Sequence, residues 1–482
     1  MNFKKNIEYF ALALILIIGA FFRLSGLGYS HFYGDETKTL YLDKTVSAVN
    51  FLLDQRKGPV QFVVAWVMEK LTGGYEPFFI RLPFAIAGVF CIPIFYLLAK
   101  KFFGVKSALI STFLFSTNGF YIAFARTAQY QSVLILFGLL AVFLYTLALE
   151  KEKKYLIVLS SLSMAISLYC HYDAIFFLIP IISLSLITKK FNLKTLFLNF
   201  ALPLVLILAV FFVPYVLKGY FYNNTVNYVG RRISGSDYGS NNSLYTIFVY
   251  NPVLFIFIIL GLAVFYILFL RQKDSVQKIF YIWFLLAFFF FEVVTSNPGT
   301  HIHNYILPLL LVSGDAFVLL YKMISKKLLK LVYSFGLIVS GAVLVLVSGL
   351  VFVPVFSKGY PWSNADYGFF KLNSIDKSSH QLYLYGFPYY RSWDKVQEYL
   401  YGIQGVRGFY TNDSAALAKY YLYKYDLTAP GYNFLPQYYV DVQNNMEFTV
   451  TDKGFLVNYE KEKDFFENGV LTATVFKLVS DK

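Results

Sequence analysis

The chain has 482 residues, of which 57% are hydrophobic and 15% are charged, and its formal net charge is +14. Its length could hold about three soluble domains, but the composition excludes an ordinary soluble protein and is typical of a polytopic membrane protein. Residues 355–482 carry 13 Lys and Arg against 14 Asp and Glu, so the positive excess belongs to the apolar remainder of the chain. The charge is therefore no sign of nucleic-acid binding.

The first apolar run follows a basic N-terminal start, as in a signal peptide. No small-residue cleavage site precedes the first carboxylates, so we expect an uncleaved first span. Cys91 and Cys170 both lie in apolar runs. They are predicted to be core residues, with no disulfide framework and no thiol metal cluster.

Apolar runs that suit a hydrocarbon core of roughly 30 Å recur along residues 9–354. The segment 59–71 is apolar but too short to span, and it is predicted to be an interfacial or re-entrant helix. The sequence predicts about eleven transmembrane helices, near residues 9–25, 79–99, 107–124, 131–149, 155–170, 173–188, 196–217, 252–270, 279–296, 304–321 and 331–354.

Lys and Arg gather in alternate loops between these spans. Six segments between residues 4 and 330 hold eighteen Lys and Arg against three acidic residues, which predicts the cytoplasmic side. The protein is then expected in the plasma (cell) membrane, with its N-terminus in the cytoplasm. Alternation of the spans from this start places loops 26–78 and 218–251 on the extracytoplasmic side. Because the number of spans is odd, the C-terminal region is predicted to lie on that side too.

After residue 354 the pattern changes to short alternating segments with helical stretches between them. We therefore expect a transmembrane domain over 1–354 and a small extracytoplasmic soluble α/β domain over 355–482. The predicted strands lie at 381–387, 448–451, 455–459 and 472–479, and the predicted helices at 393–401 and 415–425.

Ionisable residues gather near the predicted outer ends of the spans. Such groups are costly at membrane depth and usually line a cavity, so they indicate one extracytoplasmic polar site, and their mixed signs indicate a charged substrate. The set comprises Asp35, Glu36, Lys57, Arg81, Arg126, His171, Asp173, Arg231, Arg232, Glu292, His301 and His303.

Structural roles are open for several of these residues. The adjacent Asp35 and Glu36 could cap a helix or pair with Arg23. Lys57 could be a solvated loop residue, since a lysine at a helix start opposes the helix dipole. Arg81 and Arg126 could simply extend their charged ends from the membrane to water.

The histidines lie in two predicted hairpins, HYD at 171–173 and HIHN at 301–304. Histidines at i and i+2 do not share a helix face, so they are weak evidence for a metal site. Together with Asp35 or Asp173 they could hold a divalent cation, or they could form hydrogen bonds at the membrane rim. No metal site or cofactor is assigned. Glu292, in an aromatic run, is expected to pair with Arg231 or Arg232 or to reach the cavity.

Several sequence motifs follow one another between residues 10 and 190. The acidic pair is followed by RKGPVQF (56–62), IRLPFAIAGV (80–89) and FARTAQYQSVLILF (124–137). This combination resembles the membrane-embedded GT-C glycosyltransferases of the protein O-mannosyltransferase and aminoarabinose transferase type. The resemblance implies a GT-C fold, and beyond residue 190 only the architecture matches.

The resemblance implies transfer of a sugar, hexosyl or pentosyl, from a polyprenyl-phosphate donor to an acceptor protein, lipid or glycan on the extracytoplasmic face. Carried over from the family, Asp35 is the general base, Glu36 is its partner in a catalytic acidic pair and Lys57 binds the lipid phosphate. Gly58-Pro59 departs from the family's Pro-Pro, which predicts a looser loop.

Other residues are assigned more broadly. Arg126 is a second phosphate candidate, and we expect it to share one pocket with Asp35 and Lys57. Tyr130, Arg231, Arg232 and His303 are further donor-binding candidates, and Arg81, His171, Asp173, Glu292 and His301 are candidate cavity residues.

The chemistry requires these residue types independently of the resemblance. Displacing a phosphate from an anomeric carbon needs a base on the acceptor hydroxyl and positive charge at the leaving phosphate. No general acid is required, and in-line attack inverts the anomeric centre. Two other functions stay open: a lipid-linked sugar flippase or transporter, and a ligand-sensing membrane protein.

Overall fold

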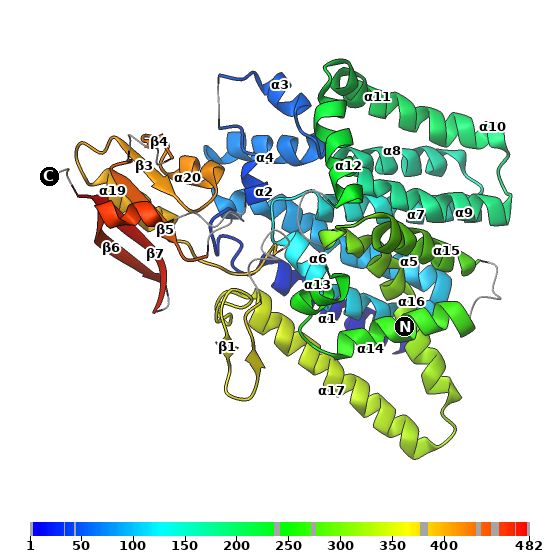
Figure 1. Ribbon diagram of the computed structural model, residues 1–482. Helices are drawn as coiled ribbons and strands as arrows, with labels where there is room; N and C mark the ends of the chain where they lie inside the picture. The colour runs from blue at the N-terminus through cyan, green and yellow to red at the C-terminus, as the bar shows by residue number, and fades with distance from the viewer. Residues whose placement is uncertain are drawn as a thin grey trace.

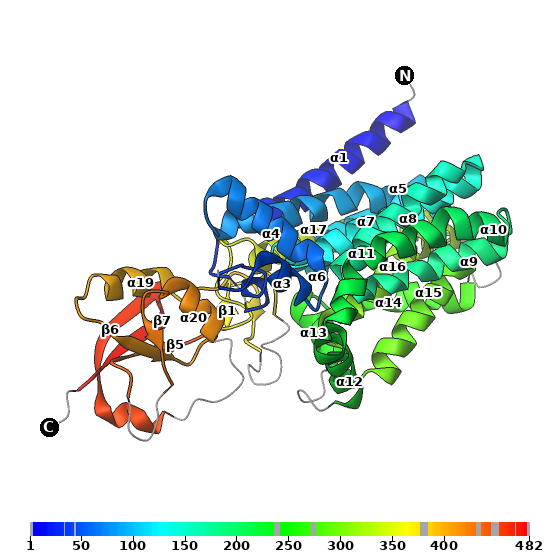
Figure 2. The ribbon, with the colours of Figure 1, turned by 90° about the horizontal axis from the view of Figure 1, so that it is seen from above.

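Long apolar helices build most of the molecule. The computed structural model describes residues 3–32, 34–42, 45–235, 242–270, 276–375, 384–429, 435–444, 453–467 and 469–479. In both views of the ribbon, the helices form one elongated bundle, and a small sheet with its helices lies together on one side of it (Figures 1 and 2).

Among the described residues, ten helices of the bundle lie at the predicted spans, and other helices connect them. The helices at the predicted spans are α1 (Phe3–Leu24), α5 (Pro77–Thr117), α7 (Gln131–Lys151), α8 (Lys154–Cys170), α9 (Leu178–Thr188), α11 (Leu202–Leu217), α14 (Phe255–Phe265), α15 (Lys278–Phe289), α16 (His303–Met323) and α17 (Lys327–Phe352). The connecting helices are α2 (Gly34–Thr37), α3 (Ala48–Leu53), α4 (Pro59–Thr72), α6 (Gly119–Ala125), α10 (Leu193–Leu196), α12 (Asn227–Ser234) and α13 (Ser243–Tyr250). Short 3₁₀ helices are η1 (Tyr172–Phe177) and η6 (Gly299–Ile302), and short π-helices are η2 (Phe197–Ala201), η3 (Phe221–Val226), η4 (Tyr266–Leu270) and η5 (Phe290–Val294).

The helical membrane architecture expected from the composition is confirmed at this level. Among the described residues, six helical segments are long and apolar enough to cross a membrane, and α8, η1 with α9, and α14 with η4 are shorter apolar helices. The count of eleven spans stays a prediction. Large apolar side chains such as Phe10, Val210 and Phe335 are exposed on the outside of the bundle, as lipid contact requires.

Helix α5 is the central element, because it packs against α1, α7 and α16. It covers two of the predicted spans in 41 residues, and only Gly104 departs from helical geometry, with φ of 79°. A glycine adopts this left-handed conformation without a side-chain clash, so the chain reverses between the two spans with almost no loop. The predicted short helix at 59–71 is present as α4, and its interfacial position stays a prediction.

The C-terminal region contains a mixed five-stranded sheet in the order β4-β3-β5-β7-β6. Strand β3 is parallel to β4 and β5, whereas β7 is antiparallel to β5 and β6. The strands and helices of this region are β1 (Ala365–Asp366), β2 (Lys371–Leu372), α19 (Trp393–Tyr401), β3 (Gly408–Thr411), α20 (Ala415–Tyr421), β4 (Asp426–Leu427), β5 (Tyr438–Val442), η8 (Gly454–Asn458), β6 (Tyr459–Glu467) and β7 (Val470–Leu478).

The predicted C-terminal elements have different outcomes. The helix at 393–401 and the strand at 472–479 are confirmed, and the helix at 415–425 ends early at Tyr421. The strand predicted at 455–459 is wrong, because most of this segment forms η8 and β6 begins only at its end. Segment 448–451 and residues 381–383 lie outside the described residues, and 384–387 form no strand. The domain boundary at residue 354 stays a prediction.

The C-terminal region is docked directly on the helical bundle. The backbone N–H of Tyr385 donates to the hydroxyl of Tyr250 at 2.8 Å, and the Tyr420 hydroxyl donates to the Tyr75 carbonyl at 2.6 Å. Gly386 has φ of 73°, and a Cβ placed on it would lie 2.5 Å from the backbone of Ala123. Only glycine therefore permits this close approach between the two parts of the chain.

A substitution at this contact tests the docking. We expect Gly386→Ala to lose about 1–2 kcal/mol of stability from its left-handed backbone and about 1–3 kcal/mol more from the clash with Ala123. The matched control is Gly405→Ala, because Gly405 has φ of 76° and open space around it. Thermal unfolding in detergent measures both variants. Equal losses would show that the close approach to Ala123 does not contribute.

Candidate active site

Asp35 lies at a meeting point of three distant parts of the chain. It is part of α2, and its carboxylate accepts a hydrogen bond from the Lys57 ammonium at 3.1 Å and from the Lys38 ammonium at 2.8 Å. The hydroxyl of Tyr385, from the C-terminal region, donates to the same carboxylate at 3.3 Å. The Asp35 side chain is 21% exposed and that of Lys57 is 16% exposed. The contact is thus shielded but still open to a ligand.

Burial and charge shift the titration of this pair. Burial raises the pKa of Asp35, but the charges of Lys57 and Lys38 outweigh it and hold the pKa well below its usual range. Burial lowers the pKa of Lys57 to about 8, although the Asp35 carboxylate acts in the opposite direction. Near neutral pH, Asp35 is therefore a carboxylate and Lys57 is mostly an ammonium.

Asp35 and Lys57 line a cavity of about 120 Å³. Among the described lining residues, five side chains are Lys or Arg and one is a carboxylate, so the cavity carries a strong positive field and is suited to an anion. Its lining consists of Asp35, Lys38, Arg56, Lys57, Gln129, Tyr130, Gln131, His171, Tyr228, Arg231, Arg232, Thr300, His301 and Tyr385.

Backbone geometry holds Lys57 in place at the start of α4. Gly58 is the N-cap residue with φ of 112°, and Pro59 is the first helical residue. A Cβ on Gly58 would lie 2.2 Å from the carbonyl oxygen of Tyr169. Pro59 needs no partner for a backbone N–H and fixes the first helical φ. The expectation of a looser loop is therefore wrong, because Gly58-Pro59 is a tightly packed helix start.

Glu36 has a role different from that of its neighbour. It is fully buried and makes a two-pronged ion pair with Arg81, with both N···O distances at 2.8 Å. It also accepts a hydrogen bond from the backbone N–H of Ala128 at 2.7 Å. Glu36 and Arg81 are both absent from the described cavity lining, so neither lies beside Asp35 in the shared pocket where it was expected from the sequence.

Arg81 connects Glu36 to the chain that follows α1. Its guanidinium donates to the carbonyl oxygens of Leu27, Ser30 and His31 at 2.8–3.0 Å. The open alternative that the acidic pair binds Arg23 is wrong, because the described partners of Arg23 are the carbonyls of Gly19 and Ser116. Arg81 is therefore a structural partner and not simply an arginine extended to water.

Arg126 does not lie where we expected it. It is fully buried and donates to the carbonyl oxygens of Phe22 and Ser25, at the C-terminal end of α1, both at 2.8 Å. These carbonyls have no partner within the helix, which explains why a cation is placed there. Arg126 is absent from the lining that Asp35 and Lys57 share.

The remaining donor-binding candidates are divided by the structure. Tyr130, Arg231 and Arg232 line the cavity, and the Lys57 ammonium lies 5.4 Å from the ring centre of Tyr130. His303 is buried outside the lining, with Nδ1 2.9 Å from the carbonyl oxygen of Thr300. Glu292 also lies outside the lining and accepts a hydrogen bond from the Tyr305 hydroxyl at 2.8 Å, in place of the expected arginine.

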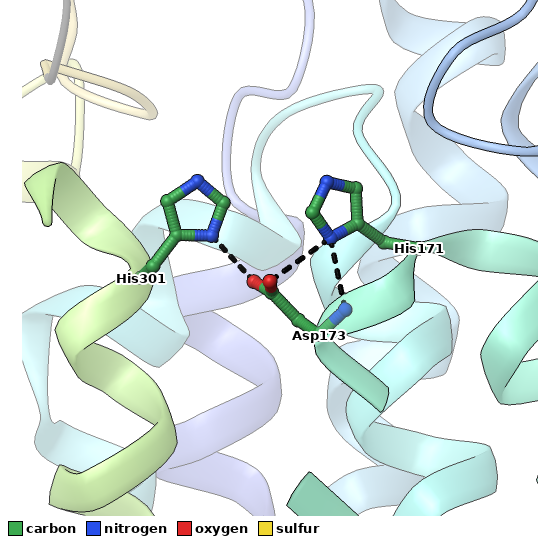
Figure 3. A group of neighbouring side chains, drawn as sticks. All are labelled: His171, Asp173 and His301. Carbon is green, nitrogen blue, oxygen red and sulfur yellow. Dashed lines mark hydrogen bonds and ion pairs between the residues drawn. The ribbon is translucent and has the colours of Figure 1, made fainter. Parts of the chain in front are cut away.

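His171, Asp173 and His301 form a compact cluster at the edge of the cavity, and both imidazoles face the carboxylate from opposite sides (Figure 3). His301 Nδ1 lies 2.5 Å and His171 Nδ1 lies 3.1 Å from the Asp173 oxygens. Burial lowers the pKa of His171 to about 4, so its ring is neutral at pH 7.

This cluster has the donor set of a divalent cation site. One ligand atom from each side chain lies within 4.8 Å of the others, and two imidazoles with a carboxylate suit Zn²⁺ or a similar ion. The backbone N–H of Asp173 also points at His171 Nδ1, at 3.1 Å. That contact competes with a metal for the Nδ1 lone pair, so His171 would ligate only after this hydrogen bond breaks or through Nε2.

Sequence reasoning missed several cavity residues. Lys38 lies three residues after Asp35, and Arg56 lies inside the motif RKGPVQF beside Lys57, so that proximity was a usable signal. Tyr228 lies with Arg56 in a cation–π contact of 3.7 Å. Tyr385 had no local signal, because it is 350 residues from Asp35. Gln129, Gln131 and Thr300 complete the set.

Comparison with known proteins supports the resemblance drawn from the motifs. Residues 56–217 match the family model described as dolichyl-phosphate-mannose-protein mannosyltransferase. "Putative mannosyltransferase YkcB" from Bacillus subtilis (strain 168) is 29% identical over 167 residues. The match covers 32% of this chain and 22% of that relative. This chain therefore spans only about a fifth of the relative's length in the match.

Solved structures extend the likeness to the whole chain. Apo ArnT from Cupriavidus metallidurans has a TM-score of 0.57 at 14% identity, and the alignment covers 99% of each chain. The chain has the GT-C fold. ArnT bound to undecaprenyl phosphate has a TM-score of 0.55 at 14% identity over 97% of each chain. Arabinofuranosyltransferase AftD from Mycobacteria has a TM-score of 0.51 at 9% identity, covering 100% of this chain and 40% of AftD.

The recognition of a GT-C architecture from the sequence is therefore confirmed. The family match covers both Lys57 and Arg126, and the structural likeness covers the bundle and the C-terminal region together.

The different environments of the two adjacent carboxylates predict different effects of neutralising them. We expect Glu36→Gln to lose about 3–5 kcal/mol of stability, because it leaves the buried Arg81 charge without its counter-ion. Asp35→Asn is the matched control, and its effect on stability should be much smaller because Asp35 is partly exposed. Thermal or denaturant unfolding in detergent measures the difference. Similar stability of both variants would contradict the structural role of Glu36.

Proposed function

We propose that this protein is a membrane glycosyltransferase that transfers a sugar from a polyprenyl-phosphate donor to a hydroxyl acceptor on the extracytoplasmic face. Asp35 is the general base, and Lys57 binds the leaving phosphate. The observation that carries the proposal is the 3.1 Å contact between Lys57 and Asp35 inside a cavity lined by five cationic side chains.

The charge of the cavity supports an anionic lipid headgroup as ligand. Arg56, Arg231 and Arg232 surround the site of the Lys57 ammonium, and arginine is suited to two-pronged recognition of phosphate. The GT-C fold is shared with ArnT, which has been solved with undecaprenyl phosphate bound. In this proposal the donor carries its sugar, hexosyl or pentosyl, on this phosphate.

The reaction proceeds with one base and no general acid. Asp35 takes the proton of the acceptor hydroxyl as that oxygen attacks the anomeric carbon. The bond between the anomeric carbon and the phosphate oxygen breaks, and the phosphate leaves with the electron pair. Lys57 and the neighbouring arginines stabilise the negative charge that develops on it. Attack opposite the leaving group inverts the anomeric centre.

The resting contact gives the donor a way to activate the base. In the described structure, Asp35 is held by Lys57, Lys38 and Tyr385, which makes it a weak base. A bound phosphate competes for Lys57 and draws its charge away from the carboxylate. The pKa of Asp35 then rises towards a value suited to proton transfer. The base is thus strengthened when the leaving group is in place.

The Asp35 assignment predicts a large loss of activity without loss of fold. We expect Asp35→Asn to lower kcat by about 10²- to 10⁴-fold, the usual contribution of a general base. The measurement is transfer from a lipid-phosphate sugar by the purified variant, with thermal unfolding as the check on folding. Full activity in a folded Asp35→Asn protein would remove Asp35 as the base.

The Lys57 assignment predicts the alkaline limb of the pH profile. Because the pKa of Lys57 is lowered to about 8, its ammonium loses its proton as the pH rises through that value. We expect kcat/KM for the donor to fall over the same range, since this ratio reports the free enzyme. Lys57→Arg keeps its charge to above about pH 12 and should abolish this limb. An unchanged limb in Lys57→Arg would assign it to another group.

A further inference from the structure

A second cavity lies between the helical bundle and the C-terminal region. It measures about 520 Å³, several times the volume of the cavity around Asp35. One wall is formed by the chain after α1 and by the residues before α5, including His31 and Glu76. The other wall comes from α19, α20 and the end of β6, including Asp394 and Tyr421.

The lining of this second cavity is aromatic and acidic. Four tyrosines, Tyr29, Tyr390, Tyr420 and Tyr421, lie beside three carboxylates, and neither Lys nor Arg is present among the described lining residues. Tyrosine rings provide rigid apolar faces with a polar edge, and carboxylates accept hydrogen bonds from hydroxyl or ammonium groups. This combination suits a carbohydrate, whose C–H faces pack on rings while its hydroxyls bond to carboxylates.

Electrostatics separates the two cavities. The cavity at Asp35 is strongly cationic, whereas the second cavity carries Glu76, Asp394 and Glu467. Asp394 and Glu467 have partners, His31 at 3.1 Å and Lys395 at 2.7 Å, and Lys395 is outside the lining. The second cavity therefore disfavours a lipid phosphate and favours a neutral or amine-bearing ligand.

Two buried residues form part of the first wall. Ser30 and His31 are 5% and 9% exposed, and both line the second cavity.

The wall is also linked to the reaction centre. Arg81 donates to the carbonyl oxygens of Ser30 and His31 and, on its other side, to the carboxylate of Glu36. Glu36 directly follows Asp35 in the chain. A single buried guanidinium thus fixes both the wall of the second cavity and the residue next to the candidate base.

We propose that the second cavity binds a carbohydrate, neutral or amine-bearing, as part of the acceptor. The acceptor role rests on the proposed function, because only transfer at Asp35 makes this ligand a substrate. Carbohydrate binding itself rests on the lining alone. The cavity then selects the acceptor while the cationic cavity selects the donor.

Binding is tested on the full chain in detergent. The probes are a soluble trimer of N-acetylglucosamine, its de-N-acetylated amine form and a lysine-containing peptide, and the readout is calorimetry or ligand-observed NMR. We expect at least one of the two sugar probes to bind and the peptide not to compete. Binding of neither sugar, or binding of the peptide alone, would overturn the proposal, the latter in favour of a basic peptide.

Variants locate the binding. Tyr390 is half-buried, and Tyr390→Ala should weaken sugar binding by about tenfold, whereas Tyr390→Phe should retain it because the ring remains. The matched control is Tyr423→Ala, because Tyr423 is 69% exposed and lies outside the cavity lining. Equal binding by Tyr390→Ala and wild type would overturn the location. If Tyr390→Ala does not fold, the conservative Asp394→Asn variant, at a carboxylate of the lining, carries the same expectation.

The outcome for the proposed function is read separately. Asp35→Asn should bind the sugar as wild type does, because Asp35 is outside the second cavity. In transfer assays, Tyr390→Ala should raise KM for the acceptor and leave both kcat and the donor KM unchanged. If Asp35→Asn keeps full transfer activity while Tyr390→Ala weakens sugar binding, the general base is refuted and the carbohydrate site stands.

Discussion

The buried ion pair between Glu36 and Arg81 is the interaction on which the rest of the site depends. Arg81 makes five hydrogen bonds, two to Glu36 and three to backbone carbonyls between Leu27 and His31. Its five N–H donors are thus used, which offsets the cost of burying the charge. Through Ala128, Glu36 also holds the connection between α6 and α7. The first loop, the central helix α5 and the start of α7 are therefore fixed relative to one another.

This frame allows two adjacent carboxylates to differ in function. Glu36 is buried away from solvent and its charge is neutralised by Arg81, so its role is to stabilise the fold. Asp35, one residue earlier, faces a cavity where Lys57, Lys38 and Tyr385 share its oxygens. Environment, and not residue type, makes one of them available to a ligand. The same frame carries the wall of the second cavity, so donor and acceptor sites of the proposed reaction would move together.

The C-terminal region is part of the candidate site and not an appendage to it. Tyr385 reaches Asp35, and Gly386 approaches the backbone of Ala123 too closely for any side chain. Tyr390, Asp394 and Tyr421 form the far wall of the second cavity. A helical bundle alone would leave one face of Asp35 uncovered and would have no acidic, tyrosine-rich wall. In the proposed mechanism the bundle supplies the phosphate-binding charges and the C-terminal region supplies the acceptor surface.

The sequence by itself determined the elements that depend on local pattern. Apolar run length specifies the helices, helical spacing specifies α19, and the motif order indicates the GT-C architecture and predicts roles for Asp35 and Lys57. Tertiary structure alone decided which charges meet. Arg81 and Arg126 look alike in sequence, each an arginine near a predicted span end, yet one neutralises Glu36 and the other caps the carbonyls of α1. Tyr385 joins Asp35 across 350 residues. Such contacts arise from the packing of whole helices. Local sequence periodicity does not predict which distant side chains this packing brings together.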